Sequence, residues 1–249
     1  MLVKKSSIIF DSINSKKGQV AVLIDPEKSD NKDILKSLLE KAKFAGINYL
    51  FIGGSTVSKT EFEKTVDFIK LNSLIPLVIF PGGSHQISEK ADGILYLSLI
   101  SGRNPDYLIG HHVQSATEMI NMDIEIISTG YILIDGGTKS SVSYVSQTTP
   151  IPRDKNNIVK STAIAGVLQG KKLLYLDSGS GAKYPITKEL IDEIIFLNVP
   201  IIVGGGIKTV EKMDELKSAG VNVIVIGNHI EENIDFLLDI KNYISSQQN

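Results

Sequence analysis

Ile201-Ile202-Val203-Gly204-Gly205-Gly206 is followed, after a helical stretch, by Val223-Ile224-Val225-Ile226-Gly227-Asn228. Each is a short β-branched run that ends in glycine, which is typical of a buried strand opening into a loop. Residues 209–218 between them have a helical pattern. Glycine lets backbone N–H groups approach a phosphate, and a following helix start adds positive potential. Two such exits in succession predict a phosphate site, which in (β/α)8 barrels often follows strands 7 and 8.

Six earlier strands are needed for such a barrel, and the sequence contains candidates for all of them. The eight candidate strands are residues 20–24, 48–52, 76–80, 93–97, 125–133, 172–176, 200–203 and 222–226. Helical patterns separate most of them, which predicts a parallel barrel or an open doubly wound sheet. The glycine exits, and the absence of Gly-x-Gly-x-x-Gly after the first strand, favour the barrel. We therefore predict an α/β protein, a single (β/α)8 TIM-barrel domain over residues 1–249.

Three of the intervening helices have clear signals. In residues 31–45 one apolar stripe is predicted, and Gly46 is a plausible stop. The stripe consists of Ile34, Leu35, Leu38, Leu39 and Ala42. Ser58-Lys59-Thr60-Glu61 has the pattern of a capping box that opens a helix. Asn104 and Pro105 are predicted to start a helix that extends to about residue 121.

Two connections are irregular. Only residues 81–92 join the third and fourth strands, so that connection has room for a short helix at most. Residues 136–157, between the fifth and sixth strands, are rich in Ser, Thr and Gly and too polar and aperiodic for the core. Long loops in compact domains are usually functional lids or disordered segments. We expect a mobile lid-like loop over the barrel mouth whose Arg153 and Lys155 meet an anionic ligand when it closes.

Composition narrows the class of protein. The net charge of −2 argues against a nucleic-acid partner, which usually requires a basic surplus. The absence of cysteine excludes disulfides and thiolate metal sites and fits the cytosol. Lys4 and Lys5 precede no long apolar segment, and no run approaches the roughly 18 apolar residues of a transmembrane helix. We expect a cytoplasmic protein.

Oxygen ligands for a metal follow the first two predicted strands. Asp25 ends the first strand, and Ser55 follows the second in Ile52-Gly53-Gly54-Ser55. A carboxylate at the C-terminal end of a barrel strand points into the mouth. A carboxylate beside a hydroxyl suits Mg²⁺, which keeps several waters and shares substrate phosphates. Alternatively Asp25 caps the next helix and Ser55 is a turn residue, and spacing alone leaves both interpretations open.

The densest polar cluster follows the sixth strand, in Tyr175-Leu176-Asp177-Ser178-Gly179-Ser180-Gly181-Ala182. Asp177 is a candidate general base, Tyr175 a hydroxyl donor, and residues 178–181 a cradle for an anion. The alternative is a flexible Gly/Ser loop. Because the cluster lies beside the glycine exit of strand seven, we expect the last three exits to form one anion-binding wall.

The four histidines are weaker candidates. His111 and His112 are adjacent in a predicted helix, so they point to different sides and do not form the usual i, i+4 metal pair. We expect them to be ordinary surface or core residues. His85 and His229 are isolated in a loop and at a helix start.

Eight motifs in this order resemble the geranylgeranylglyceryl phosphate synthase family over nearly the whole chain. They are Leu23-Ile24-Asp25-Pro26-Glu27-Lys28, Ile52-Gly53-Gly54-Ser55, Phe80-Pro81-Gly82-Gly83, Ser101-Gly102-Arg103-Asn104-Pro105, Ile127-Ser128-Thr129-Gly130-Tyr131, residues 175–181, Gly204-Gly205-Gly206-Ile207 and Ile226-Gly227-Asn228. Residues 150–155 also resemble the larger subgroup of that family, found in archaea and some bacteria.

The resemblance implies a set of site residues. It implies Mg²⁺ at Asp25 and Ser55, and a carboxylate base at Asp177, where the family usually has Glu. Glycerol 1-phosphate is implied to lie along Tyr175, Leu176, Asp177, Ser178, Gly179, Ser180 and Gly181, with its phosphate on Gly205, Gly206, Gly227 and Asn228. Ser178 stands where the family usually has alanine.

The implied activity is Mg²⁺-dependent transfer of a prenyl group, most commonly geranylgeranyl, from its diphosphate to the C3 hydroxyl of sn-glycerol 1-phosphate, which forms an ether lipid precursor. The family also implies a homo-oligomer, dimer or hexamer, and the lipid product implies a transient membrane contact. Two other interpretations stay open at this point. One is a phosphosugar isomerase or an indole-glycerol-phosphate-type barrel enzyme, with Asp25 and Asp177 as acid and base. The other is a non-catalytic barrel that binds a phosphate ligand.

Overall fold

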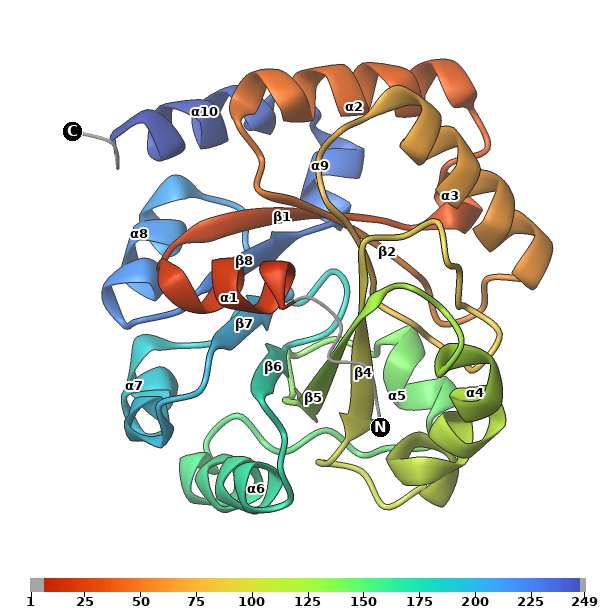
Figure 1. Cartoon of the computed structure of the whole chain (residues 1–249). Coiled ribbons are helices and arrows are strands. Elements are labelled where there is room, and N and C mark those ends of the chain that lie inside the picture. Colours follow the sequence, from red (N-terminus) through yellow and green to blue (C-terminus); the bar gives the residue numbers. More distant parts are fainter. Residues whose placement is uncertain (1–6, 247–249) are drawn as a thin grey trace.

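A computed structural model describes residues 7–246, and in it eight parallel strands close into one barrel in sequence order (Figure 1). The strands are β1 (Gln19–Ile24), β2 (Tyr49–Ile52), β3 (Leu77–Ile79), β4 (Gly93–Leu99), β5 (Glu125–Leu133), β6 (Leu173–Asp177), β7 (Ile201–Gly204) and β8 (Val223–Ile226). β8 pairs with β1 and so leaves no edge strand. The predicted barrel is confirmed, and every predicted strand is present with its ends within two residues. Lys4 and Lys5 lie outside the described residues.

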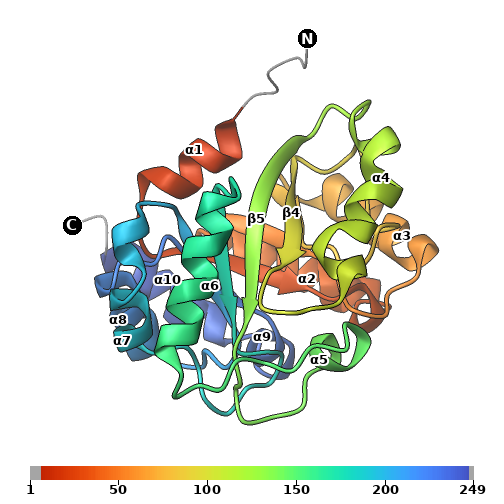
Figure 2. The same ribbon diagram turned by 90° about the horizontal axis from the view of Figure 1, so that it is seen from below.

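Helices surround the barrel. They are α1 (Ile8–Ser15), α2 (Lys32–Ala45), α3 (Lys59–Asn72), α4 (His111–Met119), α5 (Ser141–Val145), α6 (Asn156–Leu168), α7 (Lys188–Asp192), α8 (Val210–Ser218), α9 (Asn228–Glu232) and α10 (Phe236–Ser246). Viewed from below, α1 lies at one end of the barrel and α5 at the other (Figure 2). Within residues 7–246, no helix combines the length and the apolar character needed to span a bilayer.

The helix boundaries follow from local chemistry. The Asn31 side chain accepts the first free N–H groups of α2, and Gly46 ends that helix in the left-handed conformation. The predicted capping box of Ser58 and Glu61 opens α3. The helix predicted after Asn104 begins as a π-helical turn, Asp106–Gly110, before α4. Ile34 was wrongly placed on the buried stripe of α2, because its side chain is 63% exposed.

Two apolar layers hold the fold together. Inward-facing strand residues fill the barrel, among them Phe51, Leu95 and Ile202. Outward-facing residues such as Leu50 and Val203 pack against the helices. This two-sided burial explains why the strands are nearly continuous β-branched and leucine runs rather than alternating ones. The rigid barrel fixes the positions of the loops at its carboxyl end.

Helix α1 closes the amino end of the barrel, and the sequence had not predicted it. Its Ile9 and Ile13 are buried in the barrel interior layer. The backbone N–H groups of Ile9 and Phe10 donate to the Glu125 carboxylate, at 2.7 and 2.8 Å. A carboxylate at a helix start satisfies free N–H groups and matches the helix dipole. This partner lies 116 residues away in sequence, so no local signal marks the helix.

We expect Glu125→Gln to lower the free energy of unfolding by about 1–3 kcal/mol, because a buried charged acceptor of two N–H groups is lost. Urea unfolding of the variant measures this change. Glu40→Gln, at an exposed position of α2, is the matched control and is expected to stay within about 0.5 kcal/mol of the parent. Equal unfolding free energies for both variants would show that Glu125 does not anchor α1.

Both irregular connections are present, and one was misjudged. Residues 81–92 contain no helix, in agreement with the prediction. Residues 136–157 contain α5, and Ser146, Thr148 and Ile151 among them are buried, so the prediction that this segment is too polar for the core was wrong. Ile151 forms a parallel bridge with Ile134, which extends β5 beyond the barrel. Backbone pairing and buried hydroxyls that donate to backbone oxygens make a polar sequence compatible with burial.

Candidate functional site

A cavity of about 320 Å³ opens at the carboxyl ends of the strands. In (β/α)8 barrels this is the end that carries the active site. The cavity is lined by most of the predicted site residues, namely Asp25, Ser55, Tyr175, Asp177, Ser180, Gly181, Gly205, Gly206, Gly227 and Asn228. The barrel thus brings together residues that are up to 203 positions apart in the sequence.

Three predicted residues do not line this cavity. The Leu176 side chain faces outward and packs in the layer between strands and helices. Ser178 is buried, and its backbone N–H donates to the Gly204 oxygen at 3.2 Å. Gly179 uses its N–H to bind the Asp177 carboxylate. Leu176 therefore belongs to the core, and Ser178 and Gly179 shape the loop rather than face the cavity.

Asp177 is the best-positioned carboxylate in the cavity. It ends β6, opposite Gly204 of β7. Its Oδ2 accepts the Tyr131 hydroxyl at 2.5 Å, and its Oδ1 accepts the Gly179 N–H at 2.7 Å. Burial raises the pKa of Asp177, and these two hydrogen bonds offset part of that rise. The result is a fixed carboxylate that is a stronger base than one in water.

Tyr131 is a site residue that sequence reasoning missed. Its motif contributed to the family resemblance, but no role was assigned to it. Burial and the neighbouring Asp177 charge raise the pKa of Tyr131, so the phenol stays protonated and donates. Its ring packs against Tyr175, with centroids 5.4 Å apart, and against Phe80 at 5.8 Å. The pairing of β5 with β6 places Tyr131 beside Tyr175, and only that register reveals its proximity to Asp177.

We expect Tyr131→Phe to shift the acid limb of the pH profile of kcat to higher pH. The tyrosine hydrogen bond lowers the pKa of Asp177, so its loss raises that pKa. A hydrogen bond to the ionised form favours that form, so Asp177 in the variant is protonated at a pH at which the parent carboxylate is still ionised. The matched control is Tyr49→Phe, since Tyr49 is also buried and hydrogen-bonded but lies at the other end of the barrel. The same shift in both variants, or no shift in either, would contradict the role of Tyr131.

Glycine backbone forms a wall beside Asp177, and a Cβ on Gly205 would lie 2.9 Å from the Asp177 Oδ1. Gly205 and Gly206 have φ of +89° and +71°. A Cβ on Gly205 would lie 2.8 Å from the Gly179 oxygen, and one on Gly206 would lie 2.7 Å from the Ala182 oxygen. Both positions therefore require glycine on grounds of conformation and of space. The predicted adjacency of the β6, β7 and β8 exits is confirmed, and the wall presents backbone as a phosphate site requires.

The exits of β1 and β2 also meet. A Cβ on Gly54 would lie 2.9 Å from Asp25 Oδ1, and Ser55 follows at the cavity surface. Asp25 additionally caps the 3-10 turn Pro26–Lys28 by accepting the Glu27 N–H at 3.1 Å. Burial raises the pKa of Asp25, whereas the Glu27 N–H and the Lys28 charge lower it. Capping and metal binding are compatible, because the second carboxylate oxygen has no protein partner in the described structure.

The cavity extends outward from the barrel where the β3–β4 helix is absent. This extension, here called the apolar groove, lies between residues 81–92 and α4. Its lining includes Ile87, Ile94, Tyr96, Tyr107 and His112. Ser84, in the connection of residues 81–92, donates a hydrogen bond to Gln114 of α4 at 2.7 Å. The groove thus joins an apolar surface to the polar mouth of the barrel.

His111, His112 and His229 all line the cavity. The sequence predicted an ordinary surface or core position for His111 and His112, and His112 is indeed buried; it assigned no role to His229. Burial, followed by the Lys171 charge, lowers the pKa of His112, and its ring packs edge-on against Tyr96 with centroids 4.3 Å apart. His112 therefore stays neutral and acts as an aromatic wall of the apolar groove. No group of three or more His, Asp or Glu side chains in residues 7–246 is arranged to hold a metal alone.

Arg153 and Lys155, which were expected to reach the ligand when the predicted lid closes, do not line the cavity. The Arg153 guanidinium lies over the Tyr184 ring at 3.8 Å. Lys155 pairs with the adjacent Asp154 at 3.1 Å. Instead, Ser140, Val142 and Val145 of the same segment line the cavity. In this structure residues 136–157 thus contribute a mostly uncharged wall, and the prediction of their mobility stays a prediction.

A glycine wall that suits phosphate, beside a partly buried carboxylate at the mouth of an eight-stranded parallel barrel, defines a (β/α)8 barrel of the enzyme type. The chain belongs to the PcrB family, whose model matches residues 12–243. It is 47% identical to a geranylgeranylglyceryl phosphate synthase of Chitinophaga pinensis, over 88% of this chain and 87% of that protein. It is 46% identical to the enzyme of the same name from Zunongwangia profunda, over 85% and 90%.

A solved structure agrees with the barrel in detail. The (S)-3-O-geranylgeranylglyceryl phosphate synthase of Thermoplasma acidophilum, in complex with its substrate sn-glycerol-1-phosphate, is 30% identical to this chain and superposes with a TM-score of 0.87. The superposition covers 96% of each chain. The resemblance in the sequence is therefore confirmed at the level of family and of fold.

Proposed function

We propose that this protein transfers a geranylgeranyl group from its diphosphate to the C3 hydroxyl of sn-glycerol 1-phosphate. The observation that carries the proposal is the position of Asp177, hydrogen-bonded by Tyr131 and next to the glycine wall. The identity to enzymes of that name supports the same reaction. The product is an ether lipid precursor and the leaving group is diphosphate.

Different parts of the cavity bind the two substrates. Backbone at Gly205, Gly206 and Gly227 holds the glycerol phosphate by its phosphate, which places the C3 hydroxyl against the β6 exit. Asp177 takes the hydroxyl proton as the new bond forms between the C3 oxygen and prenyl C1, while the bond from C1 to diphosphate breaks. The apolar groove takes the prenyl chain. Its apolar and aromatic lining favours an apolar ligand.

Mg²⁺ fits the β1 and β2 exits by the chemistry of their donors. The Asp25 carboxylate and the Ser55 hydroxyl would hold it, and Mg²⁺ commonly takes its remaining ligands from water and substrate phosphates. When bound, it supplies charge neutralisation for the diphosphate leaving group. The homo-oligomer, the cytoplasmic location and the membrane contact remain expectations, and no observation favours the isomerase or the non-catalytic interpretation.

The proposal is tested by incubating the purified protein with sn-glycerol 1-phosphate, Mg²⁺ and prenyl diphosphates of 10 to 25 carbons. We expect an ether product and diphosphate in equal amounts, with a preference among chain lengths. Product formation that does not depend on glycerol 1-phosphate, or its complete absence with every donor, would contradict the proposal. Binding of the phosphate without turnover would favour the non-catalytic interpretation.

A further inference from the structure

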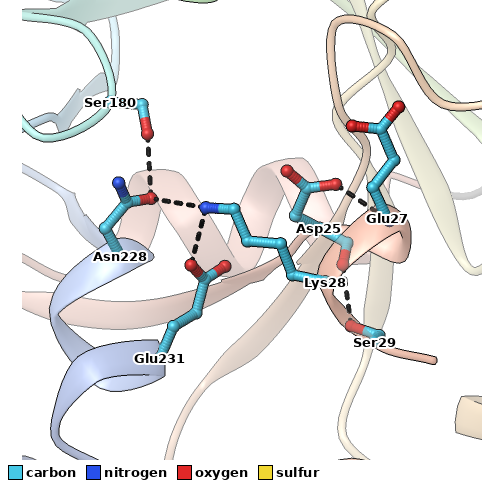
Figure 3. A network of polar contacts seen from close by, with 7 residues as sticks. All are labelled: Asp25, Glu27, Lys28, Ser29, Ser180, Asn228 and Glu231. Atoms are coloured by element: carbon cyan, nitrogen blue, oxygen red, sulfur yellow. Dashed lines mark hydrogen bonds and ion pairs between the residues drawn. The ribbon is translucent and has the colours of Figure 1, made fainter. Parts of the chain in front are cut away.

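A side-chain network crosses the mouth of the barrel and joins the exits of β1, β6 and β8 (Figure 3). Lys28, three residues after Asp25, donates to Glu231 at 2.7 Å and to Asn228 Oδ1 at 3.4 Å. Ser180 donates to the same Asn228 oxygen at 2.8 Å. All four residues line the cavity. The ammonium group of Lys28 therefore lies at the edge of the proposed phosphate site.

The network orients Asn228. Two donors converge on its side-chain oxygen, which leaves the amide NH₂ to face elsewhere. That nitrogen lies 3.6 Å from the position of a Cβ on Gly181, and in Figure 3 it points away from Lys28 and Glu231. The side-chain amide thus adds donors to a wall made of glycine backbone, as a phosphate requires.

Negatively charged side chains outnumber lysines in the cavity, so binding of a phosphate there requires a positive charge nearby. Among the described lining residues, four carboxylates (Asp25, Glu27, Asp177 and Glu231) face two lysines, Lys28 and Lys208. A phosphate dianion entering such a cavity is repelled unless a positive charge lies beside it. Backbone N–H groups supply hydrogen bonds but no full charge.

The Lys28–Glu231 pair is poorly explained as a stabilising ion pair. The two side chains are 47% and 29% exposed. Pairs this exposed contribute little to stability, because water and salt screen their attraction. A lysine ammonium has three donors, and Glu231 and Asn228 use two of them, so one remains for a ligand.

We propose that Lys28 is a binding residue for the phosphate of the glycerol phosphate, and that Glu231 only holds its ammonium at the edge of the glycine wall until the phosphate arrives. The inference rests on the proposed function. The Lys28 ammonium moves only a short way from the Glu231 carboxylate to the bound phosphate, because Asn228 lies next to both.

Two substitutions separate ligand binding from a structural ion pair. Lys28→Met and Glu231→Gln both break the pair, but only the first removes the positive charge. We expect Lys28→Met to raise the Kd of sn-glycerol 1-phosphate roughly 10- to 100-fold by titration calorimetry without prenyl diphosphate. Glu231→Gln is expected to leave that Kd within about threefold or to lower it. Lys28→Arg, which keeps the charge, is expected to retain most of the affinity.

The controls use lysines with the same substitution elsewhere. Lys41→Met breaks an ion pair with Asp235, in which the two side chains are 2.8 Å apart. Neither Lys41 nor Asp235 lines the cavity, so this variant is expected to leave the Kd unchanged. Equal weakening by Lys28→Met and Glu231→Gln would overturn the inference in favour of a structural pair. An effect of Lys208→Met without one of Lys28→Met would overturn it in favour of Lys208.

The inference and the proposed function fail in different ways. If the parent protein does not bind sn-glycerol 1-phosphate at all, the proposed function is wrong. If the parent binds it and Lys28→Met binds it equally well, only the role of Lys28 is wrong. Added salt should weaken binding more in the parent than in Lys28→Met, since the variant has lost the charge that ions screen.

Discussion

Replacing Asp177 by asparagine lowers kcat for prenyl transfer by roughly 10²- to 10⁴-fold, the usual cost of losing a general base. Asparagine keeps the size of the side chain and accepts the Gly179 N–H, but it does not take up the hydroxyl proton. The binding of sn-glycerol 1-phosphate should survive, because the glycine wall and Asn228 hold the phosphate elsewhere in the cavity. Steady-state kinetics with both substrates, together with calorimetry of the single substrate, measures the two effects.

Asp177→Glu is the matched variant, because it keeps a carboxylate and restores the residue usual in the family. We expect it to retain most of the activity. The pH profile adds a second readout. Asp177 acts in its ionised form, and burial raises its pKa, so the rate falls as the pH drops through that raised value. Turnover of Asp177→Asn within a few-fold of the parent would assign the proton to another acceptor.

Asp25→Asn is expected to raise the Mg²⁺ concentration needed for half-maximal activity by about 10- to 100-fold or more. That range is typical when a residue that merely orients a metal ligand is removed, and Asp25 is proposed as a ligand itself. The amide removes the charge that attracts a hard cation. It still accepts the Glu27 N–H, so the 3-10 turn should persist.

Glu27→Gln is the control for this variant, because Glu27 carries the same charge two residues away and lines the same cavity. Its carboxylate accepts the Thr56 hydroxyl at 2.9 Å and is not proposed as a ligand. We expect a clearly smaller change in Mg²⁺ dependence. Direct titration of Mg²⁺ should show the same ranking. Identical Mg²⁺ curves for Asp25→Asn and the parent would remove Asp25 from the metal site.

The strands and the polar exits were predictable from the sequence because their causes are local. A strand buried on both faces must be a short apolar run, and a tight exit such as Gly205-Gly206 must be glycine, since a Cβ collides there. The capping box at Ser58 is equally local. These signals fixed the order of the strands, the class of fold and the place of the phosphate wall.

Other features depend on partners that are distant in the sequence. The hydrogen bond from Tyr131 to Asp177 exists because β5 and β6 pair in one register. The polar segment around Ser146 and Thr148 is buried because its hydroxyls donate to nearby backbone oxygens, which composition does not reveal. Lys28 meets Glu231 across 203 positions only because the barrel closes β8 against β1.

The sequence by itself determined a (β/α)8 barrel with glycine-rich loops after its last strands, since burial and glycine geometry leave their mark on each short stretch. Only the tertiary structure decided which groups act together in that site. Closure of the barrel brings side chains from separate exits within hydrogen-bonding distance, and the absence of one helix between β3 and β4 opens the apolar groove. Both are consequences of packing between segments, for which no single segment carries a signal.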